Sequence, residues 1–213
     1  MSHWAIDRSE TPIRLFKSDF LEFFTHISPV AVTIIWSPVI LFFLVRGFVV
    51  RPDQVSILYI PAGILIGLFL WTFTEYTLHR FVFHYHPKSA WQEKVVFLFH
   101  GIHHVQPQCK TRLVMPPVVS IPLAAIFLGL FYLIFHVILG IPWWINPLVA
   151  GFTAGYLSYD LIHYFTHHLP MHGRAGKFLK RYHMLHHFKY PDLLFGVSNP
   201  LWDYVFRTGI PKA

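Results

Sequence analysis

Residues 114–139 read VMPPVVSIPLAAIFLGLFYLIFHVIL, a run that contains no charged side chain. A helix needs roughly 20 apolar residues to cross the hydrocarbon core of a bilayer. This run exceeds that length, and three further stretches of the chain do so as well. The sequence therefore predicts an all-α integral membrane protein with four transmembrane helices, over residues 29–50, 55–78, 114–139 and 143–166.

The composition supports a membrane protein. Hydrophobic residues make up 54% of the 213 residues and charged residues only 13%, whereas a soluble domain carries about 25% charged residues. These values exclude a disordered chain and an ordinary soluble domain. The single cysteine, Cys109, excludes an intrachain disulfide and a cysteine-rich zinc module.

The distribution of positive charge gives the orientation. Short turns at residues 51–54 and 140–142 join the four stretches into two helical hairpins, which places every long polar segment on one side of the membrane. Fifteen of the 17 Lys and Arg residues lie in those segments. By the positive-inside rule this side is cytoplasmic, with both termini there, in a bacterial inner membrane or the endoplasmic reticulum. The rule also explains the net charge of +7 without nucleic-acid binding.

Two domains are expected, an N-terminal segment over residues 1–28 and a membrane domain over 29–213. The polar parts of the membrane domain, residues 79–113 and 167–213, would form a helical cap on the cytoplasmic side. Apolar residues recur at helical spacing over residues 13–27, which predicts an amphipathic helix in the membrane interface. The alternative is that this segment extends the first transmembrane helix.

Histidine is the most unusual feature of the composition, with 16 residues. Most fall in four clusters, HRFVFH at 79–84, HGIHH at 100–104, HYFTHH at 163–168 and HMLHH at 183–187. All four lie in or next to the predicted cap. Imidazole at this density indicates metal binding or proton transfer. The candidate ligands are His79, His84, His100, His103, His104, His163, His167, His183, His186 and His187.

Helical geometry explains the spacing inside the clusters, because residues three or four apart share one face of a helix. We expect a helix over residues 90–104, capped by Ser89 and Gln92, and another that begins near Arg174. His79 and His84 are five residues apart and would point about 140° away from each other on a straight α-helix. We therefore expect the helix that carries His79, over residues 55–78, to end near Arg80, so that the chain folds His84 back.

Ten imidazoles exceed the four to six ligands of one ion, so the pattern predicts two metal ions. Glu75 and Asp160 lie one turn before His79 and His163, where a carboxylate could accept the second N–H of a ligating imidazole. The role of His168 stays open, because it points about 100° away from the face of its neighbours. The remaining histidines are interpreted as interfacial residues: His3, His26, His86, His136 and His172.

The four clusters resemble those of the fatty acid hydroxylase/sterol desaturase superfamily. The segments EYTLHRFVFH (75–84), HGIHH (100–104) with TRLVMPP (111–117), YDLIHYFTH (159–167), and YHMLHH (182–187) with FGVSNPLWDYVFRT (195–208) are most similar to fatty acid 2-hydroxylases. The resemblance spans roughly residues 67–208. It implies a di-iron monooxygenase that hydroxylates a long-chain fatty acyl lipid of the sphingolipid pathway at carbon 2, with the ten histidines above as ligands.

The resemblance also implies two iron ions as cofactors and dioxygen as co-substrate, and zinc competes well for such imidazole sites in purified samples. Family members often carry an N-terminal cytochrome b domain. This chain has some 28 residues before its first apolar stretch. We therefore expect a separate electron donor, a cytochrome b-like or ferredoxin-type protein with its reductase.

Candidate catalytic residues are Tyr156, Tyr159 and Asp160, which share the helical face that leads to His163. The alternative is that both tyrosines are interfacial aromatics. Trp202 and Asp203 could support the metal site or anchor the chain at the interface.

Two rival functions remain open. The same ligands could serve a sterol desaturase or a carotenoid hydroxylase. The chain could also be a non-catalytic metal-handling protein, although such proteins place their ligands near the middle of the bilayer.

Overall fold

The computed structural model describes residues 5–211, and within them every regular element is a helix. The chain divides into two compact units. Unit 1 comprises residues 1–29, 72–114 and 159–213, and unit 2 comprises residues 30–71 and 115–158. Helices α3 and α7 each begin in unit 2 and end in unit 1. The division expected at residue 28 stays a prediction.

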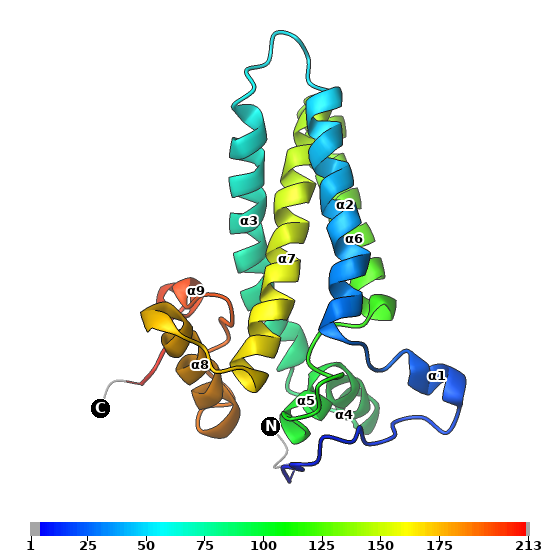
Figure 1. Ribbon diagram of the computed structural model, residues 1–213, viewed down its shortest axis with the longest axis vertical. Helices are drawn as coiled ribbons and strands as arrows, with labels where there is room; N and C mark the ends of the chain where they lie inside the picture. Colours follow the sequence, from blue (N-terminus) through cyan, green and yellow to red (C-terminus); the bar gives the residue numbers. More distant parts are fainter. Residues whose placement is uncertain (1–4, 212–213) are drawn as a thin grey trace. The chain divides into compact units, whose positions relative to one another are not determined.

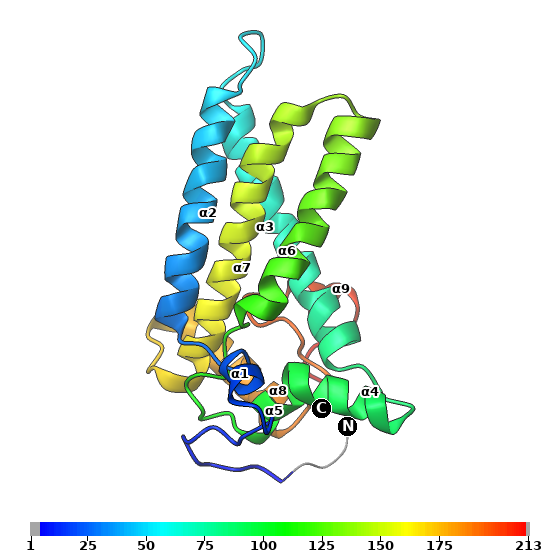
Figure 2. The same cartoon turned by 90° about the vertical axis from the view of Figure 1, so that its right-hand side faces the viewer.

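Unit 2 is built from long apolar helices that run side by side in Figures 1 and 2. The π-helical turn η3 (Leu133–Ile138) extends α6, and the short 3₁₀ turn η4 (Pro142–Trp144) precedes α7. The four long helices overlap the four apolar stretches expected from the sequence, and they begin up to four residues after those stretches do. The four helices are α2 (Pro29–Val49), α3 (Tyr59–Leu78), α6 (Pro117–Tyr132) and α7 (Ile145–His168).

Three of these helices are long and apolar enough to cross a membrane by length and composition, over Pro29–Val49, Tyr59–Phe83 and Pro117–Ile138. Helix α7 is long enough at 24 residues but is less apolar. Its first half is almost entirely buried by protein. A helix surrounded by other helices needs small side chains for close packing more than large apolar ones, which accounts for its lower hydropathy.

Glycines allow the closest helix contacts in unit 2. A Cβ atom on Gly151 of α7 would lie 2.1 Å from the carbonyl oxygen of Ile64 in α3. A Cβ atom on Gly67 of α3 would lie 2.2 Å from the carbonyl oxygen of Leu148. Both contacts are with backbone, which cannot move aside as a flexible side chain can. The two helices can therefore pack at this distance only while both positions lack a side chain.

The Gly151→Ala variant should be destabilised by about 1–3 kcal/mol or more, because the added methyl group forces the backbones of α3 and α7 apart. Thermal unfolding in detergent measures the effect. Gly129→Ala is the matched control, since a Cβ atom there meets nothing within 4 Å. Equal melting temperatures for the two variants would contradict this account of the packing.

A small apolar cavity of about 20 Å³ lies among these helices. The rings of Trp36 and Trp71 both meet that of Tyr156 edge-on, at centroid distances of 5.3 Å. Residues from all four helices surround the space: Trp36, Trp71, Ser120, Leu123, Ala124, Phe127, Phe152, Thr153 and Tyr156. Tyr156 therefore belongs to the aromatic core of unit 2.

Unit 1 contains the ends of α3 and α7 and a set of shorter helices, of which α8 is the longest at 16 residues. Figure 1 shows α4 and α5 following one another, and α8 and α9 in the C-terminal part. The elements are α1 (Asp19–Phe23), η1 (His79–Phe83), α4 (Ala90–Val96), η2 (Phe97–Gly101), α5 (Ile102–Val105), α8 (Gly173–Phe188) and α9 (Leu201–Val205).

The expectation that a helix ends near Arg80 was wrong. The chain instead continues as the π-helical turn η1, in which the N–H of His84 donates to the carbonyl of His79 at 3.0 Å. In a π-helix residues five apart are stacked on one face. This turn therefore brings His79 and His84 to the same side without ending the helix.

The helix expected over residues 90–104 is present, although it contains the π-helical turn η2 (Phe97–Gly101). The predicted capping box is absent. Ser89 makes no side-chain cap bond, and the Gln92 side chain accepts from the N–H of Lys88 at 2.7 Å. Helix α8 begins at Gly173, as expected for the helix near Arg174.

The N-terminal segment is mostly extended, and its only helix among the described residues is α1. The helix expected over residues 13–27 is therefore limited to Asp19–Phe23. Phe20 and Phe23 are 72% and 70% exposed, which keeps the interfacial location of this segment a prediction.

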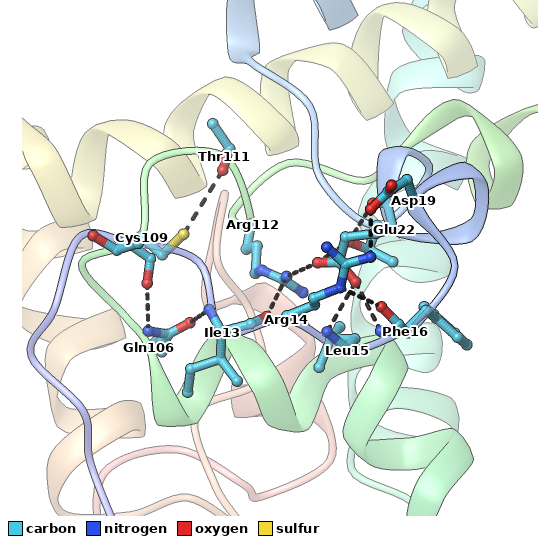
Figure 3. Close-up of polar contacts among 12 residues, drawn as sticks. Ile13, Arg14, Leu15, Phe16, Asp19, Glu22, Gln106, Cys109, Thr111 and Arg112 are labelled. Carbon is cyan, nitrogen blue, oxygen red and sulfur yellow. Dashed lines mark hydrogen bonds and ion pairs between the residues drawn. The ribbon is translucent and has the colours of Figure 1, made fainter.

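The buried side chains of Gln106 and Arg112 hold this segment against the rest of unit 1 (Figure 3). The Gln106 side chain accepts from the N–H of Ile13 at 2.9 Å and donates to the carbonyl of Thr11 at 3.0 Å. Glu22 forms an ion pair with Arg112 at 2.8 Å and accepts from the N–H groups of residues 15 and 16. Partial burial acts to raise the pKa of Glu22, but these N–H groups and Arg112 lower it below its usual value. The segment therefore fixes the chain that directly follows His103 and His104.

Candidate metal centre

All ten histidines predicted as ligands come together in unit 1, in two groups of five. Within each group one ligand atom per residue lies within 4.8 Å of all the others. The first group consists of His79, His84, His100, His104 and His186, and the second of His103, His163, His167, His183 and His187. Each group could hold one metal ion.

The doubled histidines divide between the two groups. His103 belongs to the second group and His104 to the first, and His186 and His187 divide in the same way. Adjacent residues on a helix point about 100° apart, so each pair can serve two neighbouring ions. The HxxHH motif thus contributes to both groups from one turn of helix.

The Nε2 atoms point at one another inside each group. Those of His79 and His100 are 3.1 Å apart, as are those of His84 and His186. In the second group the Nε2 atoms of His103 and His163 are 2.9 Å apart. The ligand atom is therefore Nε2 in these residues, and Nδ1 faces outward.

Hydrogen bonds at Nδ1 fix the protonation state of two imidazoles. His79 Nδ1 lies 2.6 Å from the carbonyl oxygen of Phe195, and His186 Nδ1 lies 2.7 Å from that of Leu193. A carbonyl only accepts, so both Nδ1 atoms carry the proton. A neutral imidazole has one N–H, which leaves both Nε2 atoms as bare lone pairs. Both Nε2 atoms are therefore free to bind a metal ion, and both residues belong to the first group.

Burial keeps these side chains neutral. It lowers the pKa of His186 to about 4, although the Leu193 carbonyl and Asp192 act in the opposite direction. Burial likewise holds the pKa values of His100, His103 and His183 well below the usual range, and neighbouring imidazoles add to the effect. A neutral imidazole is the form that binds metal ions. The groups are thus ready to bind near neutral pH without losing protons.

The loop over residues 193–198 orients the first group. Its Leu193 and Phe195 carbonyls accept from His186 and His79, and Leu194 between them has a φ of 63°. A left-handed conformation is costly for a leucine. It is maintained here because Leu194 is fully buried and its N–H donates to the carbonyl of Thr208 at 2.9 Å.

Two buried carboxylates hold this loop in place. Asp203 accepts from the N–H groups of Phe195 at 2.9 Å and Gly196 at 2.7 Å. Glu75 accepts from the N–H groups of Val197 at 2.7 Å and Ser198 at 2.8 Å. The carboxylates therefore act on the histidines through the backbone of the loop, since its carbonyls receive the imidazole protons.

The expected contact between Glu75 and His79 is thus replaced by an indirect one, because the hydrogen bond of His79 goes to the carbonyl of Phe195. Asp160 is 1% exposed, in the turn before His163. The ring of Tyr159 lies 5.8 Å from that of His163 at a shallow angle. Tyr156 belongs to unit 2. The catalytic roles of these three residues stay predictions.

His26, His86, His136 and His172 lie outside both groups, as does His168, whose ring lies 4.8 Å from that of Tyr164 between centroids. His3 lies outside the described residues. Sequence reasoning left the role of Asp203 undecided between support and anchoring. The structure shows a supporting position, with Asp203 fully buried and bound to the loop. The FGVS segment at 195–198, directly upstream of WD at 202–203, was the available signal.

A sequence profile of fatty acid hydroxylases matches residues 64–208, which is more than half of the chain. This chain belongs to the fatty acid hydroxylase family. It is 40% identical to the dihydroceramide fatty acyl 2-hydroxylase FAH1 of Arabidopsis thaliana over 206 residues, which cover 97% of this chain and 83% of that protein. It is 36% identical to the ceramide very long chain fatty acid hydroxylase SCS7 of Saccharomyces cerevisiae over 193 residues, covering 89% of this chain and 48% of that protein.

The fold is also shared. The structure of full-length scs7p, in which only the hydroxylase domain is visible, matches with a TM-score of 0.79 at 35% identity. The match covers 91% of this chain and 70% of that chain. Both the resemblance noted in the sequence and the expected all-α fold of an integral membrane hydroxylase are thereby confirmed.

The Asp203→Asn variant should weaken metal binding by the first group about 10–100-fold, as is typical when an outer hydrogen-bond partner is lost. The NH2 group that replaces one carboxylate oxygen cannot accept a hydrogen bond, so one of the two N–H groups of the loop loses its partner. Metal retention against a chelator, followed by elemental analysis, measures the effect. Tyr204→Ala is the control, since Tyr204 is 63% exposed beside it. Unchanged retention in Asp203→Asn would show that the loop needs no such anchor.

Proposed function

We propose that this protein is a membrane-bound fatty acid 2-hydroxylase, which inserts one oxygen atom of dioxygen at carbon 2 of a long-chain fatty acyl group. The relatives named above are hydroxylases of fatty acyl groups, two of them with ceramide or dihydroceramide in their names. The substrate of this protein is accordingly a fatty acyl lipid of the sphingolipid type, taken from the bilayer.

The observation that carries this proposal is the convergence of ten imidazoles in two adjacent groups of five, with the Nε2 atoms of His79 and His186 free of protons. Imidazole ligands suit iron through its redox changes, whereas a hydrolytic zinc site keeps fewer protein ligands and an open position. In this proposal the ten histidines hold two iron ions, which supply the activation of dioxygen.

The reaction needs electrons that the ligands cannot provide. One oxygen atom enters the C–H bond of the substrate and the other leaves as water, which consumes two electrons and two protons. In this proposal a separate electron-carrier protein delivers the electrons one at a time. The partners are thus the acyl lipid, the lipid bilayer and this carrier.

The chain itself supplies orientation and a dry environment. Glu75 and Asp203 fix the loop whose carbonyls hold the protons of His79 and His186 on Nδ1, so that Nε2 stays available as a ligand. The side chains of His79, His100 and His103 are at most 4% exposed, which excludes water from the ligand atoms. Tyr159, beside His163, is the nearest candidate of the three predicted catalytic residues for a hydroxyl that donates a proton.

The first test expresses the protein in cells together with a reductase system and measures 2-hydroxy acyl lipids by mass spectrometry. The parent should produce them. The double variant His103→Ala/His186→Ala, which removes one ligand from each group, should lower the yield at least about 100-fold, since a missing metal ligand abolishes the chemistry rather than weakening substrate binding.

The control is His86→Ala, because His86 is exposed and lies outside both groups. It should keep the activity of the parent. Hydroxylation at another carbon or on a sterol would contradict the proposed substrate position, and no new lipid despite iron loading and a competent donor would contradict the oxygenase itself.

Metal content provides an independent check. His186→Ala and His187→Ala alter adjacent residues that belong to different groups. Each single variant should bind one equivalent of metal fewer than the parent, and the double variant should lose both. Inductively coupled plasma mass spectrometry of the purified protein gives the count. Loss of both ions in each single variant would indicate a single shared site.

A further inference from the structure

Helix α8 has a basic face that no part of the proposed chemistry uses. Arg174, Lys177 and Arg181 are exposed and lie within about 60° of one another at 3.6 residues per turn. The helix contains no Asp or Glu. None of the three cations forms an ion pair or hydrogen bond among residues 5–211. The positive charge of this face is thus uncompensated within the described chain.

This basic face lies on the opposite side of α8 from three candidate metal ligands. His183 is about 180° from Arg174 around the helix, with His186 and His187 about 60° and 40° to either side of that direction. These three histidines are buried and reach both metal groups. A helix with its side chains is about 10–12 Å across, so little more than one helix separates the exposed cations from the ligands.

Aromatic side chains complete the face. Phe178 and Phe188 are 39% and 57% exposed, and both lie on the same side as the cations. Arginine with aromatic residues is typical of the centre of a protein–protein interface. The ring of Phe178 lies 5.5 Å from that of Tyr182, which is buried and directly precedes His183. The face therefore continues inward to Tyr182, the neighbour in the chain of the candidate ligand His183.

We infer that the outer face of α8, formed by Arg174, Lys177, Phe178, Arg181 and Phe188, is the docking surface for a small acidic electron-carrier protein. This inference rests on the proposed function, which needs an external source of electrons. Electron transfer slows steeply with distance, so a carrier must dock where little protein covers the metal ions. At each docking event the carrier is oxidised by one electron, and a metal ion is reduced by one.

A lipid surface is the less favoured occupant. A helix that lies in a membrane interface separates its basic residues from its aromatic and aliphatic ones onto opposite faces. In α8 the exposed phenylalanines share one face with the cations, and the opposite face is occupied by the histidines. This arrangement suits an acidic protein surface with an apolar centre better than a bilayer.

The test measures binding of two reduced carriers to the full-length protein in nanodiscs of zwitterionic lipid. The carriers are the soluble haem domain of a cytochrome b-type protein and a plant-type [2Fe–2S] ferredoxin, both acidic. The charge-reversal variant Arg174→Glu/Lys177→Glu/Arg181→Glu should raise the Kd of the better-binding carrier about tenfold or more at low salt. The difference should shrink at roughly 0.5 M ionic strength, where such charges are screened.

The matched control is Arg8→Glu/Lys88→Glu/Lys94→Glu, which makes the same change of charge at other exposed positions of unit 1. Its Kd should stay within about twofold of the parent, since charges far from a contact surface contribute little. The neutral variant Arg174→Gln/Lys177→Gln/Arg181→Gln should give an intermediate Kd. Metal content equal to the parent shows that each variant is folded.

Turnover separates failure of the docking surface from failure of the proposed function. The charge-reversal variant should lose 2-hydroxylation driven by the carrier but keep that driven by dithionite with a viologen dye. A parent that forms no 2-hydroxy lipid with the dye contradicts the proposed function, whatever the binding data show. Parent-like Kd and carrier-driven turnover in the charge-reversal variant would overturn the docking surface. The same follows if the variant loses only its binding to vesicles with phosphatidylglycerol, which would make α8 a lipid-binding face.

Discussion

The hydrogen bonds that hold the protons of His79 and His186 on Nδ1 are the constraint on which the rest of the first group depends. His79 and His186 hold their protons on Nδ1 and face neighbouring imidazoles with bare Nε2 atoms about 3 Å away. These two nitrogens are thereby kept ready to bind a cation. The loop over residues 193–198, the carboxylates of Glu75 and Asp203 and the strained Leu194 all stabilise this arrangement. The loop and the two carboxylates therefore form one hydrogen-bonded unit with His79 and His186.

The spacing of the histidines allowed the clusters that come together in the structure to be recognised from the sequence. Residues three or four apart on a helix share a face whatever the surrounding fold, and this rule placed HGIHH and HMLHH correctly. It failed for HRFVFH, because a five-residue spacing fits a π-helical turn, and the local sequence does not predict such a turn. The doubled histidines could be recognised, but their division between two groups depends on tertiary packing.

The hydrogen bonds that hold the loop over residues 193–198 were harder to predict. Glu75 lies one turn before His79 in the sequence, which suggests direct contact, yet it reaches the N–H groups of a segment more than 120 residues away. No local pattern encodes such a pairing. The four apolar stretches were evident from composition. The burial of α7 by its neighbours was not, because it follows from close packing at glycines such as Gly151.

The division of His103–His104 and of His186–His187 between the two groups also bears on the kinetics of electron transfer. One peptide bond links a histidine of one group to a histidine of the other, and this occurs on both α5 and α8. The two groups are therefore held at a fixed separation. Metal ions bound by them would have ligands with little room to move when an electron arrives. A rigid donor set keeps the reorganisation energy low, which favours rapid acceptance of electrons from a weakly bound carrier.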